Sequence, residues 1–131
     1  MRTWLLRALL LASMVPLASA QVDDRPHGMY CGGNMLIYEG KLTASTVSIT
    51  VVDPAGYHVW NARVQVQMIG RNDIIFDREA NAHGRLKLRR LRPGEYWLGV
   101  SARGFNLHYW HLSKSWSQPD KALRVVLTLG T

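Results

Sequence analysis

The chain has 131 residues, 47% of them hydrophobic, and carries a formal net charge of +7. This length suits a single domain with one modest hydrophobic core. The only cysteine, Cys31, excludes an intramolecular disulfide and a cysteine-based structural zinc site.

The first 20 residues have the pattern of a secretory signal peptide. Two arginines precede an apolar stretch over residues 8–15, and residues 18–20 (Ala-Ser-Ala) form a small-residue cleavage site. The alternative is a membrane anchor, but an anchor needs about 20 apolar residues and this stretch ends at Pro16. We therefore expect a periplasmic or secreted protein with no membrane span after the signal peptide is removed.

Residues 21–44 are expected to form an extended N-terminal arm. They show no clean hydrophobic period and contain several glycines, with a short edge strand predicted over residues 35–38. Cys31 lies in this arm. Its sequence context leaves open a dimer-forming thiol, a reactive thiol or a plain unpaired cysteine.

Residues 45–131 are expected to form a domain of seven short strands. Apolar and polar residues alternate with period two, as when one face of a strand is buried and the other is wet. The strands are predicted near residues 46–52, 62–68, 74–79, 85–89, 95–101, 106–112 and 123–129. Turn residues such as Pro93-Gly94 separate them, and no helical period intervenes. The pattern predicts an all-β, seven-stranded antiparallel Greek-key sandwich.

Several motifs within this domain carry a family resemblance. They are Val51-Val52-Asp53-Pro54-Ala55-Gly56, Gly84-Arg85-Leu86-Lys87-Leu88, Leu91-Arg92-Pro93-Gly94-Glu95-Tyr96-Trp97-Leu98, Gly104-Phe105 and Val125-Val126-Leu127-Thr128-Leu129. Together they resemble the carboxypeptidase regulatory-like domain, a prealbumin-like sandwich also grouped with carbohydrate-binding-like folds. Asn61 and residues 81–84 depart from the family pattern, both in predicted loops. The resemblance implies an accessory role, because such domains accompany metallocarboxypeptidases without holding their zinc site.

No catalytic set is recognisable in the sequence. The chain lacks the Tyr-Arg-Gly-Ser type tail of hydroxyisourate hydrolases and the His-x-His pair of intradiol dioxygenases, and Val100 stands where self-crosslinking adhesin domains need a glutamate. His108 and His111 are three residues apart, which places them on opposite faces of a strand. We therefore predict a non-enzymatic protein with no metal and no cofactor.

A row of cations is the first candidate for binding. The row comprises Arg85, Lys87, Arg89, Arg90 and Arg92. The first three fall on one face of a predicted strand, opposite Leu86 and Leu88. Such a row can hold phosphates, acidic glycans or anionic lipid headgroups. The alternative is a solvated face whose like charges discourage pairing at a sheet edge.

Tryptophans are the second candidate. Trp97 is expected to face outward beside Gly99, Trp110 shares a strand face with His108, and Trp116 lies in a polar loop. An exposed indole can stack on a sugar ring, whereas a buried one is a packing residue.

The functional expectation is an exported, non-enzymatic module that contacts a protein or a cell-envelope component. The alternative is a carbohydrate-binding module that uses the three tryptophans together with the basic strand face. Nucleic acid is not an expected partner of an exported protein. The sequence leaves the ligand and the oligomeric state open.

Overall fold

The computed structural model describes residues 25–33 and 35–130, so the predicted signal peptide lies outside the described residues. Within the described ranges the chain is all-β, with eight strands and no helix, and hence no helix that could cross a membrane. The strands are β1 (Leu36–Ala44), β2 (Val47–Val52), β3 (Arg63–Met68), β4 (Ile74–Glu79), β5 (Arg85–Leu88), β6 (Gly94–Ser101), β7 (Leu107–Lys114) and β8 (Lys121–Val126).

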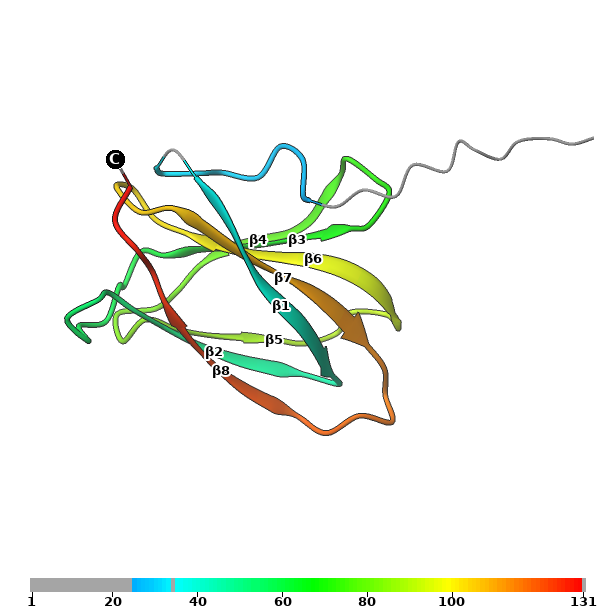
Figure 1. Cartoon of the computed structure of the whole chain (residues 1–131). Coiled ribbons are helices and arrows are strands. Elements are labelled where there is room, and N and C mark those ends of the chain that lie inside the picture. The colour runs from blue at the N-terminus through cyan, green and yellow to red at the C-terminus, as the bar shows by residue number, and fades with distance from the viewer. Residues whose placement is uncertain (1–24, 34, 131) are drawn as a thin grey trace, which may run out of the picture.

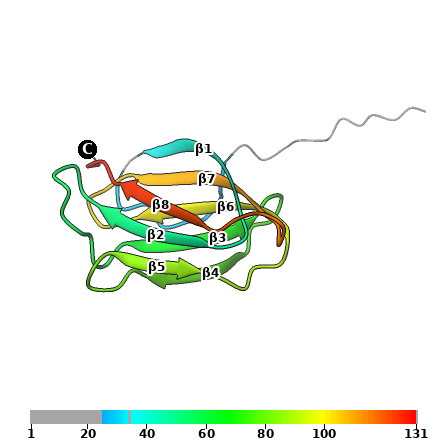
Figure 2. The same ribbon diagram turned by 90° about the horizontal axis from the view of Figure 1, so that it is seen from below.

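The strands form two mixed sheets that lie one over the other (Figure 1). The larger sheet has the order β1-β7-β6-β3-β4 and the smaller one the order β5-β2-β8. Strands β1 and β7 run parallel, as do β2 and β8, and the remaining pairs are antiparallel. Figure 2 shows that the edge strands β4 and β5 lie on the same side of the molecule.

The hydrophobic core lies between the two sheets. Alternate residues of the central strands fill it, among them Val64 of β3, Leu98 of β6 and Ile49 of β2, each at most 1% exposed. Burying an aliphatic side chain of this size stabilises a fold by about 1.5–3 kcal/mol. The period-two pattern of the sequence is therefore the pattern of this shared core.

The structure differs from the sequence prediction in strand number and strand direction. Residues 36–44, which the sequence places in the arm apart from a short edge strand, form β1 and pair with β7 along its length. The register skips one residue between Tyr38 and Gly40, so Glu39 is bulged and the alternation of β1 is broken. Alternation also carries no information on direction, and the predicted wholly antiparallel arrangement is wrong for two pairs.

Residues 25–33 do form an arm, and it lies on the outer side of the larger sheet (Figure 1). Gln67 of β3 binds the arm backbone twice, since its Oε1 accepts the N–H of His27 at 2.9 Å and its Nε2 donates to the carbonyl oxygen of His27 at 2.6 Å. Gln65 Oε1 accepts the N–H of Tyr30 at 2.7 Å, and Ser101 Oγ donates to the Tyr30 carbonyl oxygen at 2.7 Å. Polar side chains of an outer sheet face are thus buried as partners of the arm backbone.

Candidate functional site

The tryptophans do not form the predicted exposed platform. Trp97 projects from the outer face of β6, as expected, but it is only 6% exposed. Its ring packs edge-on against Tyr109 at a centroid distance of 5.6 Å and lies 5.7 Å from the His111 ring. The expectation that Trp97 is exposed is wrong, because β6 is a central strand whose outer face is crowded by its neighbours.

The other two predicted tryptophans occupy different environments. Trp110 belongs to the core between the sheets and is 7% exposed. Trp116 is 65% exposed, and Lys114 Nζ lies 3.3 Å from the centre of its ring. The three tryptophans are therefore not one surface, and Trp116 alone among them offers a ring to solvent.

The basic row lies at the edge of the smaller sheet. Arg85 and Lys87 are exposed on β5, opposite Leu86 and the buried Leu88, as the alternation predicts. Arg89 follows the last residue of β5 and is exposed in the loop toward β6. Its position beyond the strand end directs it to a neighbouring groove, which the sequence alone does not reveal.

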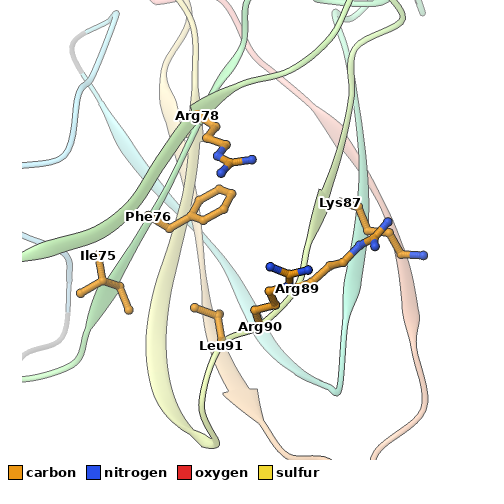
Figure 3. A pocket seen from close by; sticks show the side chains of 7 residues that line it. All are labelled: Ile75, Phe76, Arg78, Lys87, Arg89, Arg90 and Leu91. Carbon is orange, nitrogen blue, oxygen red and sulfur yellow. The ribbon is translucent and has the colours of Figure 1, made fainter.

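This groove lies between the edge strands β4 and β5 and has a volume of about 560 Å³ (Figure 3). Its lining combines four cations with three apolar side chains: Arg78, Lys87, Arg89 and Arg90 with Ile75, Phe76 and Leu91. Phe76 is half-buried and packs against the core, while Leu91 is 9% exposed. The groove therefore has an apolar floor at the open mouth between the two sheets.

Strand alternation on β4 separates its charges. Phe76 and Arg78 point toward β5 in Figure 3, and the Arg78 guanidinium lies 5.6 Å from the centre of the Phe76 ring. Asp77 lies on the opposite face, where both its oxygens accept hydrogen bonds from Arg63 at 2.8 Å. These bonds lower the pKa of Asp77 below its ordinary value. The nearest carboxylate along β4 is thus turned away from the groove and already paired.

Among the described residues, the four groove cations have no such hydrogen-bonded carboxylate, although the hydrogen bonds of Thr46 and Ser45, and to a smaller extent the charge of Lys87, lower the pKa of Asp120. None of Arg78, Lys87, Arg89 and Arg90 makes an ion pair with another residue in the part of the chain that the structure describes. Four cations around one hollow repel one another, and this repulsion is relieved when an anion enters. Arginine suits this role because its planar fork can bind carboxylate or phosphate through two parallel hydrogen bonds.

Arg90 adds backbone strain to the groove. Its φ is +63°, and among the described residues it is the one non-glycine residue with positive φ. This left-handed conformation costs an ordinary L-residue on the order of 1 kcal/mol, and such strain concentrates at binding sites. The neighbours of Arg90 in the chain, Arg89 and Leu91, also line the groove (Figure 3).

A second polar cluster joins residues that are far apart in sequence. His108 is 2% exposed, and its Nδ1 lies 2.6 Å from Glu39 Oε2. Its Nε2 accepts the backbone N–H of Thr128 at 3.1 Å and lies 2.9 Å from Thr128 Oγ1. Because Nε2 accepts, Nδ1 carries the proton and donates to Glu39. Both ring nitrogens of His108 are thus hydrogen-bonded, which connects β1 and β7 to the chain after β8. The sequence alone does not predict this carboxylate–imidazole–hydroxyl arrangement.

Metal ligands do not gather in the structure as described. Across residues 25–33 and 35–130, no three histidine, cysteine, aspartate or glutamate side chains come close enough to hold a metal ion. Cys31 lies half-buried in the arm, where its Sγ is 3.1 Å from the carbonyl oxygen of Gly33. Comparison with known proteins adds no assignment, since no family model and no curated protein matches the sequence.

Proposed function

We propose that this chain is an exported, non-enzymatic binding module that holds an anionic partner in the groove between β4 and β5. The observation that supports this proposal most directly is the set of four cations, none of which forms an ion pair within the described residues, around the apolar floor formed by Phe76 and Leu91. A merely solvated charged face does not need a hollow or an apolar floor. Both features serve a ligand that combines negative charge with apolar contact.

The architecture is compatible with the wider expectation from sequence. Two packed β-sheets with a shared core suit a sandwich of the carboxypeptidase regulatory-like type, and that family would imply an accessory role. The signal-peptide pattern of residues 1–20 supports export. An accessory role and export together favour a protein or a cell-envelope component as the partner.

If the protein binds a carbohydrate, it does so at a site other than the three predicted tryptophans together. Trp97 and Trp110 are buried, so a sugar platform built on them is not part of the proposal. Trp116 remains exposed, and so does Trp60, at 62%. An acidic glycan could still compete for the cations of the groove, and the test below therefore includes one.

The proposal is tested by reversing charge in the groove. The groove variant, Lys87→Glu/Arg89→Glu, removes two of the four cations, and the control variant, Lys121→Glu/Arg124→Glu, makes the same net change on exposed residues of β8. Binding to polyglutamate and to heparin is measured by titration at several salt concentrations. We expect the groove variant to lose affinity about tenfold more than the control variant, because local contacts and not net charge determine binding. Equal losses in both variants would contradict the proposal.

A further inference from the structure

We infer that the groove accepts an extended acidic polypeptide, which adds as a strand to the free edge of β5. This inference rests on the proposed function and names the class of its partner. It comes from the backbone of β5, from the shape of the hollow beside it and from the charge of its lining.

The free edge of β5 has an open pair of backbone groups at Lys87. Arg85 shows which way such groups point, because its N–H donates to Asn81 Oδ1 at 3.0 Å and its carbonyl oxygen accepts the Asn81 N–H at 2.9 Å. Asn81 thus satisfies Arg85 much as a partner strand would. Backbone groups two residues apart on a strand point the same way, so those of Lys87 also face away from β2. In the described structure no hydrogen bond satisfies them.

A second hollow of about 300 Å³ is lined by Asn81, Arg85, Leu86 and Lys87 together with residues of β2. This hollow lies over the paired strands β2 and β5, and Lys87 lines both it and the groove. The two hollows therefore meet at Lys87, the residue whose backbone groups are open at the free edge.

The chemistry of the lining specifies the added strand. A strand presents side chains alternately to its two faces. A segment that alternates acidic and apolar residues can place carboxylates on the cations of the groove and apolar side chains on Phe76 and Leu91. Backbone hydrogen bonds would supply affinity, and the side-chain alternation would supply specificity.

The same charges exclude a second copy of this chain as the occupant. Pairing β5 with another β5 would bring Arg85 and Lys87 of both copies together, and opposed like charges destabilise a strand pair. Cations at this edge therefore reject self-association and favour an acidic partner. The basic row would thus both bind anions and discourage pairing with another β5, the two interpretations that the sequence leaves open.

The inference is tested with a synthetic peptide of alternating glutamate and valine, long enough to extend from Lys87 to Leu91, beyond the stretch of β5 that Asn81 already covers. The control peptide has the same sequence with every backbone nitrogen methylated, so it keeps the charge and the side chains but cannot donate a hydrogen bond. Affinities are measured by fluorescence anisotropy for the natural protein, the groove variant and the control variant. Amide exchange of the natural protein is followed with and without peptide.

We expect the unmodified peptide to bind about tenfold or more tightly than the methylated peptide, and to slow exchange at the Lys87 amide. The comparison of peptides uses the natural protein, so it does not depend on the folding of a variant. Equal binding of the two peptides, or displacement of the peptide by heparin with no change at the Lys87 amide, would overturn strand addition while leaving the proposed anion site intact. Peptide and heparin binding that is equal in the groove variant and the control variant would overturn both.

Discussion

Gln67 offers the sharpest test of how the arm is held on the sheet. Its side chain is 0% exposed and makes three hydrogen bonds: one with the His27 N–H, one with the His27 carbonyl oxygen and one with the carbonyl oxygen of Asn72, the last at 3.1 Å. Gln67→Ala removes all three. Each buried hydrogen bond contributes about 0.5–1.5 kcal/mol net, so the expected loss in free energy of unfolding is about 2–4 kcal/mol.

Part of this loss should appear as local detachment of the arm. Tyr30 lies in the arm, with its ring 5.1 Å from the Arg63 guanidinium, so chymotryptic cleavage after Tyr30 reports whether the arm has left the sheet. We expect Gln67→Ala to speed this cleavage under conditions in which the domain stays folded. Urea denaturation followed by tryptophan fluorescence gives the global stability.

Gln118→Ala is the matched control, because Gln118 is an exposed glutamine in the loop between β7 and β8 and no side-chain hydrogen bond is made by it among the described residues. This control should change stability by less than about 0.5 kcal/mol. If Gln67→Ala matches the control in both stability and cleavage at Tyr30, then the hydrogen bonds to the arm do not hold it in place.

Three further predictions concern packing and charge. A Cβ on Gly32 would overlap the backbone carbonyl oxygen of Ala102, whereas one on Gly99 would overlap Sδ at the end of the flexible Met29 side chain. Gly32→Ala should therefore lower the urea midpoint more than Gly99→Ala does. Burial lowers the pKa of Lys114, so the folded state loses stability as pH falls from the ordinary lysine pKa through the folded one. Lys114→Met should remove that slope from a stability–pH curve, and an unchanged slope would contradict this. The hydrogen bonds of Arg63 lower the pKa of Asp77, so this pair stabilises the fold above the ordinary aspartate pKa and loses its effect as pH falls through the folded pKa; Asp77→Asn should flatten the acid limb of a stability–pH curve.

Much of the strand content could be predicted because each core strand buries one face against the other sheet. The sequence predicts strands over residues 62–68 and 95–101, and the structure has β3 at Arg63–Met68 and β6 at Gly94–Ser101. In both, valine, leucine and tyrosine at alternate positions fill the core. The predicted exposure of Arg85 and Lys87 is confirmed for the same reason.

The outer face of the larger sheet could not be predicted in this way. Trp97, Gln65 and Gln67 alternate with core residues, so period two assigns them to solvent. They are buried because neighbouring strands and an arm from distant parts of the sequence cover them. Gly99 is the one local clue, since its bare backbone leaves room for Met29 of the arm.

Predicting the groove needs the strand order of both sheets as well as the alternation of polar and apolar residues. The basic row predicted from sequence includes three of the groove cations, Lys87, Arg89 and Arg90, but not Arg78. Nothing in the spacing indicates that β4 and β5 each end a sheet on the same side of the molecule (Figure 2). Arg78 lies near the other cations only because the edge strand of one sheet lies beside the edge strand of the other. The left-handed backbone of Arg90 is equally invisible in the sequence, since arginine carries no preference for it.

The two faces of β4 and β3 then explain why the cations of the groove stay free. Alternation sends Asp77 to the outer face, where Arg63 and Gln65 both donate to it, and Gln65 in turn binds the arm. On this part of the outer face, Asp77, Arg63 and Gln65 are therefore partners of one another within the chain. Phe76 and Arg78, one residue away on either side, face the mouth between the sheets, where no carboxylate lines the groove. The negative charge that the proposed partner brings would therefore be the one carboxylate or phosphate charge in this groove, since its own lining holds only cations and apolar side chains.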